Sequence, residues 1–227
     1  MNYASVAERI RLIWRVLLMP LLHIRMWGGP EAKKAFASCL RSRGQIPLLR
    51  KRTFGMALMA LPANYANPFP GPAFKTFRSL HRRAQQLGYT FASFYGPLQL
   101  EQMLAIHTSV PERQGLPMTS SYTDRGTVKR YVKTCGALYG VFNGQGVLCA
   151  YCDCPVAGEA AMPVRIMGDY KLLRDGIMYF LVWELAMHFA GQRDSTGYPR
   201  WISYGSYLGG RTEMRIFKTE CGFRLTA

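Results

Sequence analysis

The chain has 227 residues, of which 49% are hydrophobic and 19% are charged, and its 29 Lys and Arg against 13 Asp and Glu give a net charge of +16. This composition excludes a disordered chain, because the apolar content is enough to offset the conformational entropy lost on folding. The excess of positive charge favours an anionic partner: nucleic acid, anionic lipid, an acidic carrier protein or a phosphorylated cofactor.

The six cysteines follow no dense disulfide spacing, and the chain opens without a short apolar core that leads to a small-residue cleavage site. We therefore predict a reducing, cytoplasmic setting. Cys149, Cys152 and Cys154 stand close together in the sequence. A structural zinc site needs four ligands, however, and no second Cys or His pair stands nearby, so we predict buried thiols and no metal.

Residues 1–72 are predicted to form a basic N-terminal extension that begins with an amphipathic helix over 3–27. Apolar residues recur there at helical spacing between arginines, and Pro20 is expected to kink or end the helix. The charges make a membrane crossing costly, which leaves two alternatives. The helix packs on the core of the domain, or it lies on an anionic membrane through Trp14 and Trp27, which would place the protein peripherally at the inner membrane face.

The remainder of the extension is predicted to hold a short basic helix after the Gly-Gly-Pro break at 28–30, a strand over 53–61 and a loop over 62–72. This loop contains four prolines among Asn and Gly, which makes it the clearest domain boundary in the chain. We expect the second domain to cover residues 73–227.

The second domain shows a regular alternation of helical and strand patterns. It begins with a helix over 75–87, a strand over 89–95, a helix over 98–109, a polar loop over 113–122 and a helix over 123–133. A hairpin follows, whose strands over 136–142 and 147–155 flank a turn with Asn143 and Gly144 at its tip. The expected order then continues with a strand over 160–167, a polar connection over 168–176, an apolar helix over 177–190, a strand over 201–204, a helix over 211–220 and a last strand over 223–226.

This order of elements resembles the GNAT fold, and the C-terminal part carries a sharper pattern. Leu-Val-Trp-Glu-Leu-Ala lies within the helix at 181–186, Ile-Ser-Tyr-Gly forms a strand at 202–205, and Phe-Lys at 217–218 is followed by Gly-Phe at 222–223. Residues from about 136 to 227 are thereby similar to the FemAB-like branch of the GNAT-like acyltransferase superfamily. The resemblance implies an α/β (α+β) fold with a mixed, largely antiparallel sheet flanked by helices.

The resemblance also implies an enzyme that moves an acyl or aminoacyl group from a phosphate-bearing carrier to an amine of a small molecule or peptide. Acyl-CoA is slightly favoured as the co-substrate, with aminoacyl-tRNA or an acidic acyl carrier protein next, and no cofactor is expected to be tightly bound. The chain departs from ordinary acetyl-CoA enzymes at the entry of the helix at 177–190, where their Gln/Arg-x-x-Gly-x-Gly/Ala signature is missing.

The polar connection before that helix is the predicted phosphate site. A helix N-terminus offers unpaired backbone N–H groups, and Tyr170, Lys171, Arg174 and Gly176 would surround a bound phosphate. In this interpretation Lys171 and Arg174 add charge and Gly176 lets the backbone approach closely. The alternative is a solvated turn that Asp175 caps.

Transfer to an amine needs a group that removes a proton and a group that supplies one to the leaving atom, and the candidates are Asp169, Tyr204, Tyr207 and Glu213. Tyr204, at the end of a predicted strand, is the preferred general acid, and a core tyrosine is the alternative. The resemblance places Lys218 near the carrier phosphate or the developing oxyanion, and a surface lysine is the alternative.

Arg113, Gln114 and Tyr122 bring a guanidinium, an amide and a hydroxyl to one loop and are predicted to bind an acceptor carboxylate. We expect Glu184 and His188, four residues apart on one helix, to form a buried hydrogen-bonded pair. A different class of function remains open, in which a module without enzymatic activity binds RNA or an anionic membrane through the N-terminal helix and residues 75–83.

Overall fold

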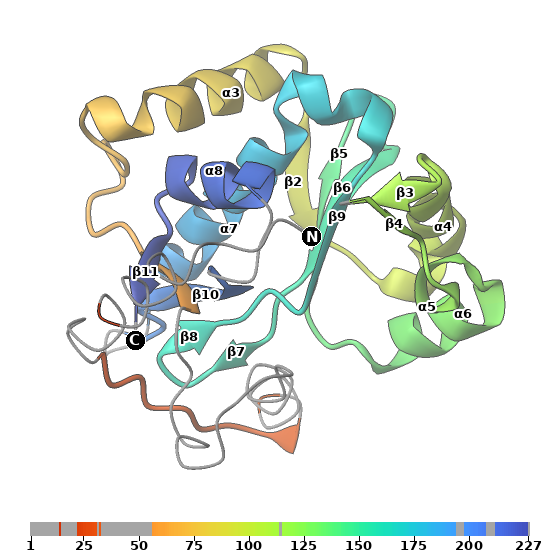
Figure 1. The fold of residues 1–227 in the computed structure, drawn as a ribbon, viewed down its shortest axis with the longest axis horizontal. Helices are drawn as coiled ribbons and strands as arrows, with labels where there is room; N and C mark the ends of the chain where they lie inside the picture. The colour runs from red at the N-terminus through yellow and green to blue at the C-terminus, as the bar shows by residue number, and fades with distance from the viewer. Residues whose placement is uncertain are drawn as a thin grey trace.

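The computed structural model describes residues 14, 22–30, 32, 56–113, 115–193, 198–207 and 212–226. Two sheets form the centre of the described part, and helices cover them (Figure 1). One sheet has the order β2–β5–β6–β9 and the other the order β11–β1–β10–β8–β7. Apart from the parallel β8–β10 pair, the neighbouring strands are antiparallel, which confirms the predicted fold class.

The helices and strands follow the predicted order closely. The strands are β1 (Met56–Ala60), β2 (Thr90–Ser93), β3 (Glu112–Arg113), β4 (Leu116–Pro117), β5 (Leu138–Phe142), β6 (Leu148–Asp153), β7 (Val156–Ala157), β8 (Ala160–Ala161), β9 (Arg165–Gly168), β10 (Trp201–Ser206) and β11 (Arg224–Thr226). The helices are η2 (Pro72–Phe74), α3 (Lys75–Gln86), η3 (Gly96–Gln99), α4 (Leu100–Thr108), α5 (Ser120–Thr123), α6 (Arg125–Thr134), η4 (Tyr170–Asp175), α7 (Ile177–Gly191) and α8 (Thr212–Glu220).

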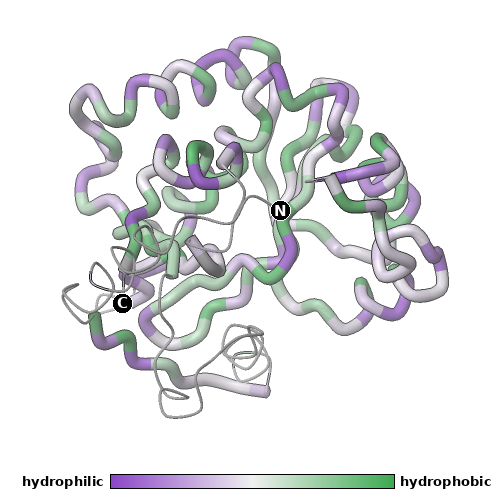
Figure 2. Tube along the Cα trace, in the orientation of Figure 1, coloured by the Kyte–Doolittle hydropathy of each residue, from purple (hydrophilic) through white to green (hydrophobic). Residues whose placement is uncertain are grey.

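The hydrophobic core beside the four-stranded sheet is built from the apolar helix α7 and the inner strand β6. All six residues of β6 are buried, and α7 contacts β5, β6 and β9. Helix α4 also contacts β6 and β9, and α3 packs against α7. Figure 2 shows α7 as a largely hydrophobic helix, while α3 alternates between polar and apolar residues. The difference follows from burial, because α7 lies between a sheet and another helix and α3 has one face in solvent.

The strand assigned to the extension, β1, lies inside the five-stranded sheet. It pairs with β10 on one side and with β11 on the other, and both pairs are antiparallel. The domain boundary at residue 72 stays a prediction, but β1 shares its sheet with the C-terminal strands.

The single strand expected over 160–167 is wrong, because the chain forms two strands that belong to different sheets. Ala160 and Ala161 of β8 pair with β10 in parallel, whereas β9 pairs with β6 in the other sheet. Pro163 lies between them and has no N–H to donate to a ladder. The two sheets therefore separate at this point of the chain.

Three other expectations change. The polar loop over 113–122 contains the small β3–β4 hairpin and the short helix α5. Residues 22–27 of the predicted N-terminal helix lie outside any helix, and most of that helix falls outside the described residues. Glu184 accepts a hydrogen bond from His81 on α3 at 2.7 Å and not from His188, because packing brings α3 onto α7.

Two of the expectations from sequence concern membrane crossing and metal binding. None of the described helices combines the length and the apolar character that a bilayer crossing needs. Within the same ranges, no group of three His, Cys, Asp or Glu side chains is placed to hold a metal ion.

Gly176, between η4 and α7, gives a test of the contact between α3 and α7. Its φ is +86°, and a Cβ at this position would lie 2.6 Å from the carbonyl oxygen of Leu80. We expect Gly176→Ala to lower the free energy of unfolding by about 2 kcal/mol or more. The left-handed backbone disfavours any residue with a Cβ, and the added methyl group would also clash with Leu80. Gly144→Ala is the control, because a Cβ there meets nothing within 4 Å. Equal urea midpoints for the two variants would contradict this packing.

Candidate active site

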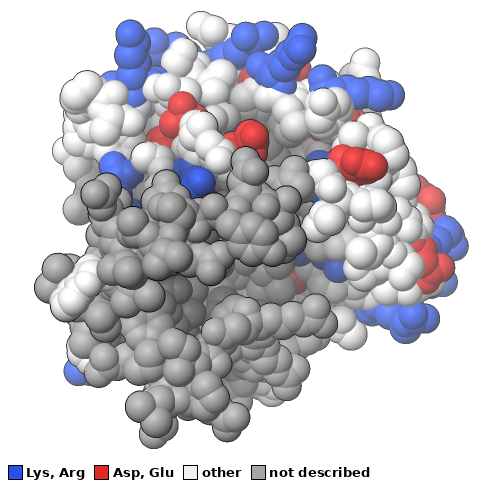
Figure 3. All heavy atoms as spheres, viewed as in Figure 1, with Lys and Arg blue, Asp and Glu red and all other residues white. Residues whose placement is uncertain are grey.

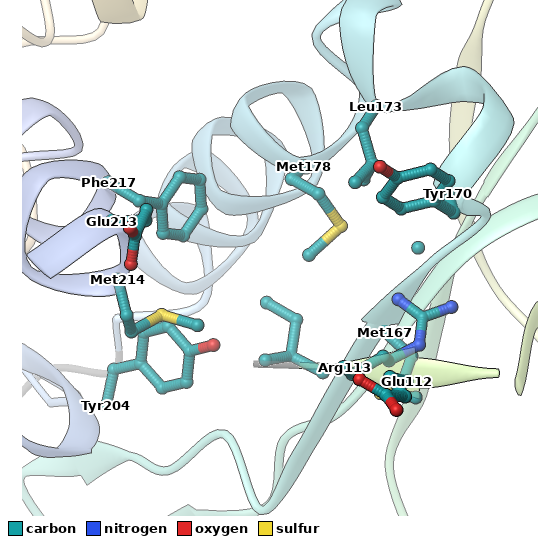
Figure 4. Close-up of a pocket in the computed structure, with 12 residues that line it drawn as sticks. Glu112, Arg113, Met167, Tyr170, Leu173, Met178, Tyr204, Glu213, Met214 and Phe217 are labelled. Atoms are coloured by element: carbon teal, nitrogen blue, oxygen red, sulfur yellow. The ribbon is translucent and has the colours of Figure 1, made fainter. Parts of the chain in front are cut away.

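A cavity of about 580 Å³ lies between β9 and β10. Helices α7 and α8, the η4 turn and the β3–β4 hairpin complete its walls (Figure 4). The residues that line this β9–β10 cavity are Glu112, Arg113, Ile166, Met167, Gly168, Tyr170, Leu173, Met178, Tyr204, Glu213, Met214 and Phe217. Its volume is in the range of small-molecule sites.

The separation of the two sheets produces this cavity. Strand β10 pairs with β8 only through Trp201 and Ile202, so Tyr204 lies beyond the end of that pairing. After β8, the chain continues into β9, which is an edge strand of the four-stranded sheet as described. The second half of β10 and the edge of β9 therefore face each other across open space instead of forming a ladder.

Tyr204 presents its hydroxyl group to this space, as Figure 4 shows. Its ring packs edge-on against Phe223, with 5.6 Å between the ring centres. Burial raises the pKa of Tyr204 above its ordinary value. The hydroxyl is therefore protonated at neutral pH and available as a hydrogen-bond donor or acid.

Lys218 lies behind Tyr204 and does not line the cavity. Its Nζ donates to the Tyr204 carbonyl oxygen at 2.8 Å and lies 4.4 Å from the centre of the Tyr204 ring. Burial lowers the pKa of this ammonium group to about 8. The resemblance implied contact with phosphate or an oxyanion, and the structure places the ammonium group against the backbone and ring of Tyr204.

Arg113 and Tyr170 are held in the cavity wall by a residue that the sequence analysis missed. The Ser109 hydroxyl accepts a hydrogen bond from Arg113 Nη2 at 3.0 Å and another from the Tyr170 backbone N–H at 3.0 Å. Arg113 Nη2 also donates to the Ile106 carbonyl oxygen at 2.6 Å. Ser109 thus connects the end of α4 to both the β3–β4 hairpin and η4.

The predicted phosphate cradle is divided between two environments. Asp169 caps η4, because its Oδ1 accepts from the Lys171 backbone N–H at 2.9 Å. The side chains of Lys171 and Arg174 are exposed. Gly176 is buried, and the close neighbour that its missing side chain admits is Leu80 of α3. The Asp175 carboxylate accepts from the Tyr89 hydroxyl at 2.8 Å.

The other predicted residues lie away from the cavity or beyond the description. Tyr122 does not line the cavity; the guanidinium of Arg165 lies 4.3 Å above its ring. Tyr207 shares a hydrogen bond of 2.6 Å with Thr219. Gln114 lies outside the described residues. Of the predicted acceptor group, Arg113 is the member that the structure places at the cavity.

A buried histidine fixes the position of the loop that carries Tyr122. His107 Nδ1 lies 2.7 Å from the Tyr122 carbonyl oxygen and its Nε2 lies 2.6 Å from the Tyr151 hydroxyl. Burial lowers the pKa of His107 to about 4, so the ring is neutral. Nδ1 must donate to the carbonyl, and Nε2 then accepts from the Tyr151 hydroxyl. This network ties the loop to the buried strand β6.

Most of the cavity wall is apolar, which the sequence analysis did not foresee. Three methionines, Met167, Met178 and Met214, come from a strand and two helices that are separate in the sequence. Glu213, one of the four candidates for proton transfer, also lines the cavity. The only signal available from sequence was the apolar face of each element, and this face equally predicts core packing.

The sequence matches no known protein family and no curated protein. Solved structures do match it: L-PGS from Bacillus licheniformis (14% identity over 75% of this chain and 57% of that chain, TM-score 0.52) and FemX (10% identity, 75% and 59%, TM-score 0.56). The C-terminal domain of a predicted lysylphosphatidylglycerol synthetase from Agrobacterium fabrum also matches (18% identity, 76% and 57%, TM-score 0.51).

The chain shares its GNAT-like fold with these structures. This confirms the fold that the resemblance implied for the C-terminal part. The chain spans 57–59% of the length of these matching chains, so the likeness covers a part of each. Within the GNAT-like fold, the β9–β10 cavity lies where the two sheets separate.

The buried Lys218 makes the free energy of unfolding of the GNAT-like fold vary with pH in the alkaline range. Its pKa in the folded protein is about 8, against 10.5 ordinarily, so between these values the unfolded chain holds a proton that the folded protein has lost. The free energy of unfolding should therefore rise with pH across this window, relative to Lys218→Met, by on the order of 2–3 kcal/mol.

Urea denaturation at intervals from pH 7 to pH 10 measures this difference. Lys129→Met removes an exposed lysine of α6 and serves as the control. A difference between wild type and Lys218→Met that stays constant with pH would contradict the buried-ammonium assignment.

Proposed function

We propose that the protein transfers an acyl or aminoacyl group from a phosphate-bearing carrier to an amine, and that the β9–β10 cavity is the site of transfer. The observation that carries this proposal is the protonated Tyr204 hydroxyl, which points into a largely apolar cavity of substrate size. An acid in such a place can protonate a leaving thiolate or alkoxide that few other groups would solvate.

The proposed reaction is a direct transfer with two proton movements. The amine nitrogen attacks the carbonyl carbon of the thioester or ester, and a C–N bond forms while the C–S or C–O bond to the carrier breaks. Glu213, whose side chain lines the cavity, takes the proton that the amine loses. Tyr204 gives its proton to the leaving sulfur or oxygen and regains one from solvent, and Lys218 positions Tyr204 through its carbonyl oxygen and ring. The products are an amide and the free carrier.

A basic surface beside the cavity supports a carrier that bears phosphates. Lys75, Arg82 and Arg83 on α3 and Lys171 and Arg174 on η4 are exposed. Helix α3 touches the end of η4 at Gly176, and Tyr170 of η4 lines the cavity. Figure 3 shows Lys and Arg side chains gathered along the edge of the molecule where α3 lies. Carrier phosphates bound to this α3–η4 surface would hold the acyl end near Tyr204.

Two carriers fit this arrangement, acyl-CoA and aminoacyl-tRNA, with an acidic acyl carrier protein as a third. The fold likeness to FemX and to L-PGS supports aminoacyl transfer, because the FemAB-like pattern of the C-terminal part speaks for aminoacyl-tRNA among the possible donors. The cytoplasmic location and the peripheral membrane contact through residues 3–27 remain predictions. Binding of RNA or membrane without transfer is the second candidate function, and the α3–η4 surface is what favours it.

Tyr204→Phe tests the acid role. It removes one hydroxyl, so we expect the turnover number to fall by about 100-fold while the melting temperature stays close to that of the wild type. Release of free thiol from acyl-CoA, or of uncharged tRNA from aminoacyl-tRNA, in the presence of a panel of amines measures transfer. Tyr95→Phe changes an exposed tyrosine outside the cavity and is the control. Equal turnover in both variants would remove Tyr204 from the mechanism.

Neutralising basic side chains on α3 distinguishes the possible carriers. We expect the triple variant Lys75→Gln, Arg82→Gln, Arg83→Gln to weaken binding of aminoacylated tRNA and to lower the slope of log affinity against log salt by about 2. CoA, with few phosphates, should change less. The control is Lys129→Gln, Arg130→Gln, Lys133→Gln on α6, which removes the same charge elsewhere. Equal losses in the two triple variants would show that net charge alone matters.

A further inference from the structure

We infer that the transferred group is apolar, an alkyl acyl chain or an aminoacyl group with an apolar side chain, and that it binds against Met178. This inference rests on the proposed function, because it names the class of group that the β9–β10 cavity accepts. The cavity wall is apolar, and Met178 lies in close contact with Gly168.

The middle of the cavity is bounded by apolar side chains. Figure 4 shows the Met178 side chain reaching into the space, with Phe217 to one side and Leu173 to the other. Ile166, Met167 and Met214 complete this apolar surface. A charged group buried here would lose its hydration and would need a charged partner. The acidic residues of the lining, Glu112 and Glu213, are exposed.

The cations of the lining do not change this conclusion. Arg113 is the one cationic side chain among the described residues of the lining, and its Nη2 is already engaged by the Ile106 carbonyl and the Ser109 hydroxyl. It lies on the β3–β4 side, away from Phe217 and Met214 on α8 (Figure 4). A carboxylate on the transferred group would therefore have to leave the apolar surface to reach it.

Gly168 sets the position of Met178 and hence the depth of the cavity. A Cβ on residue 168 would lie 2.5 Å from Met178 Sδ and 3.3 Å from Leu173 Cδ2. The thioether therefore rests directly on the backbone at the end of β9, and any side chain there would push it away from the strand. Gly168 and Met178 are specificity-determining residues in this reading, because together they decide how long a group fits.

The methionine-rich wall suits groups of more than one shape. A methionine side chain is unbranched and changes rotamer easily, so three of them can adapt to an alkyl chain. Each methylene that enters such a wall contributes hydrophobic free energy in proportion to the surface that it buries. Affinity should thus rise with chain length until the cavity is full.

The experiment uses straight-chain acyl thioesters of N-acetylcysteamine, from two to ten carbons, and measures their dissociation constants for the full chain by calorimetry. These probes contain no phosphate, so the α3–η4 surface does not contribute. We expect affinity to increase about fourfold per added methylene up to a limiting length. Met178→Phe should shorten the limiting length, and Met178→Ala should lengthen it. Gly168→Ala should act like Met178→Phe, and melting curves identify any variant that fails to fold.

Met187→Ala is the matched control, since it makes the same change on the same helix at a residue outside the cavity lining. Affinity that does not depend on chain length would overturn the inference, and so would equal effects of Met178→Ala and Met187→Ala. The same measurements distinguish a failure of the proposed function from a failure of this inference. If chain length governs binding but Tyr204→Phe does not lower transfer, the cavity binds apolar groups without the proposed chemistry. If Tyr204→Phe lowers transfer and chain length has no effect, the proposed function stands and this inference is wrong.

Discussion

The interruption of the ladder at Pro163 is the constraint on which the site depends. Because this residue donates no N–H, the chain leaves β8 in one sheet and resumes as β9 in the other. Strand β10 stays with β8, so its second half and the edge of β9 are left apart. The cavity, the accessibility of the Tyr204 hydroxyl and the apolar wall all follow from a sheet that does not close.

Side chains around the cavity are held by contacts from outside it. The Ser109 hydroxyl joins Arg113 and Tyr170, and Lys218 binds the carbonyl oxygen of Tyr204. The neutral His107 connects the neighbouring loop to β6. Such a supporting shell keeps reacting groups in place without occupying the space that a substrate needs. The residues that line the cavity and the residues that hold them are therefore different sets.

Local pattern predicted the elements well and the site only in part. The Asn143–Gly144 turn and the apolar run of α7 carry their structure in neighbouring residues, and both were predicted correctly. The split at Pro163 was missed because the apolar content of 160–167 continues across it. The partner of Glu184 was wrong because helical spacing suggested His188, whereas the fold brings His81 from α3. Tyr204, Tyr170 and Arg113, which line the cavity, were named from their chemistry and remain predictions, whereas the methionine wall is a product of tertiary packing.

The central position of β1 has a consequence for how the molecule is assembled. Met56 of β1 pairs with Thr226 of β11 and with Ser206 of β10, so the five-stranded sheet is joined by contacts between distant parts of the sequence. Bringing these segments together costs loop-closure entropy before the contacts form, and proteins with such long-range strand pairing fold slowly. During synthesis, β1 leaves the ribosome well before its two partner strands, β10 and β11. A fragment that begins after the proline-rich loop would lack the strand that joins β10 to β11.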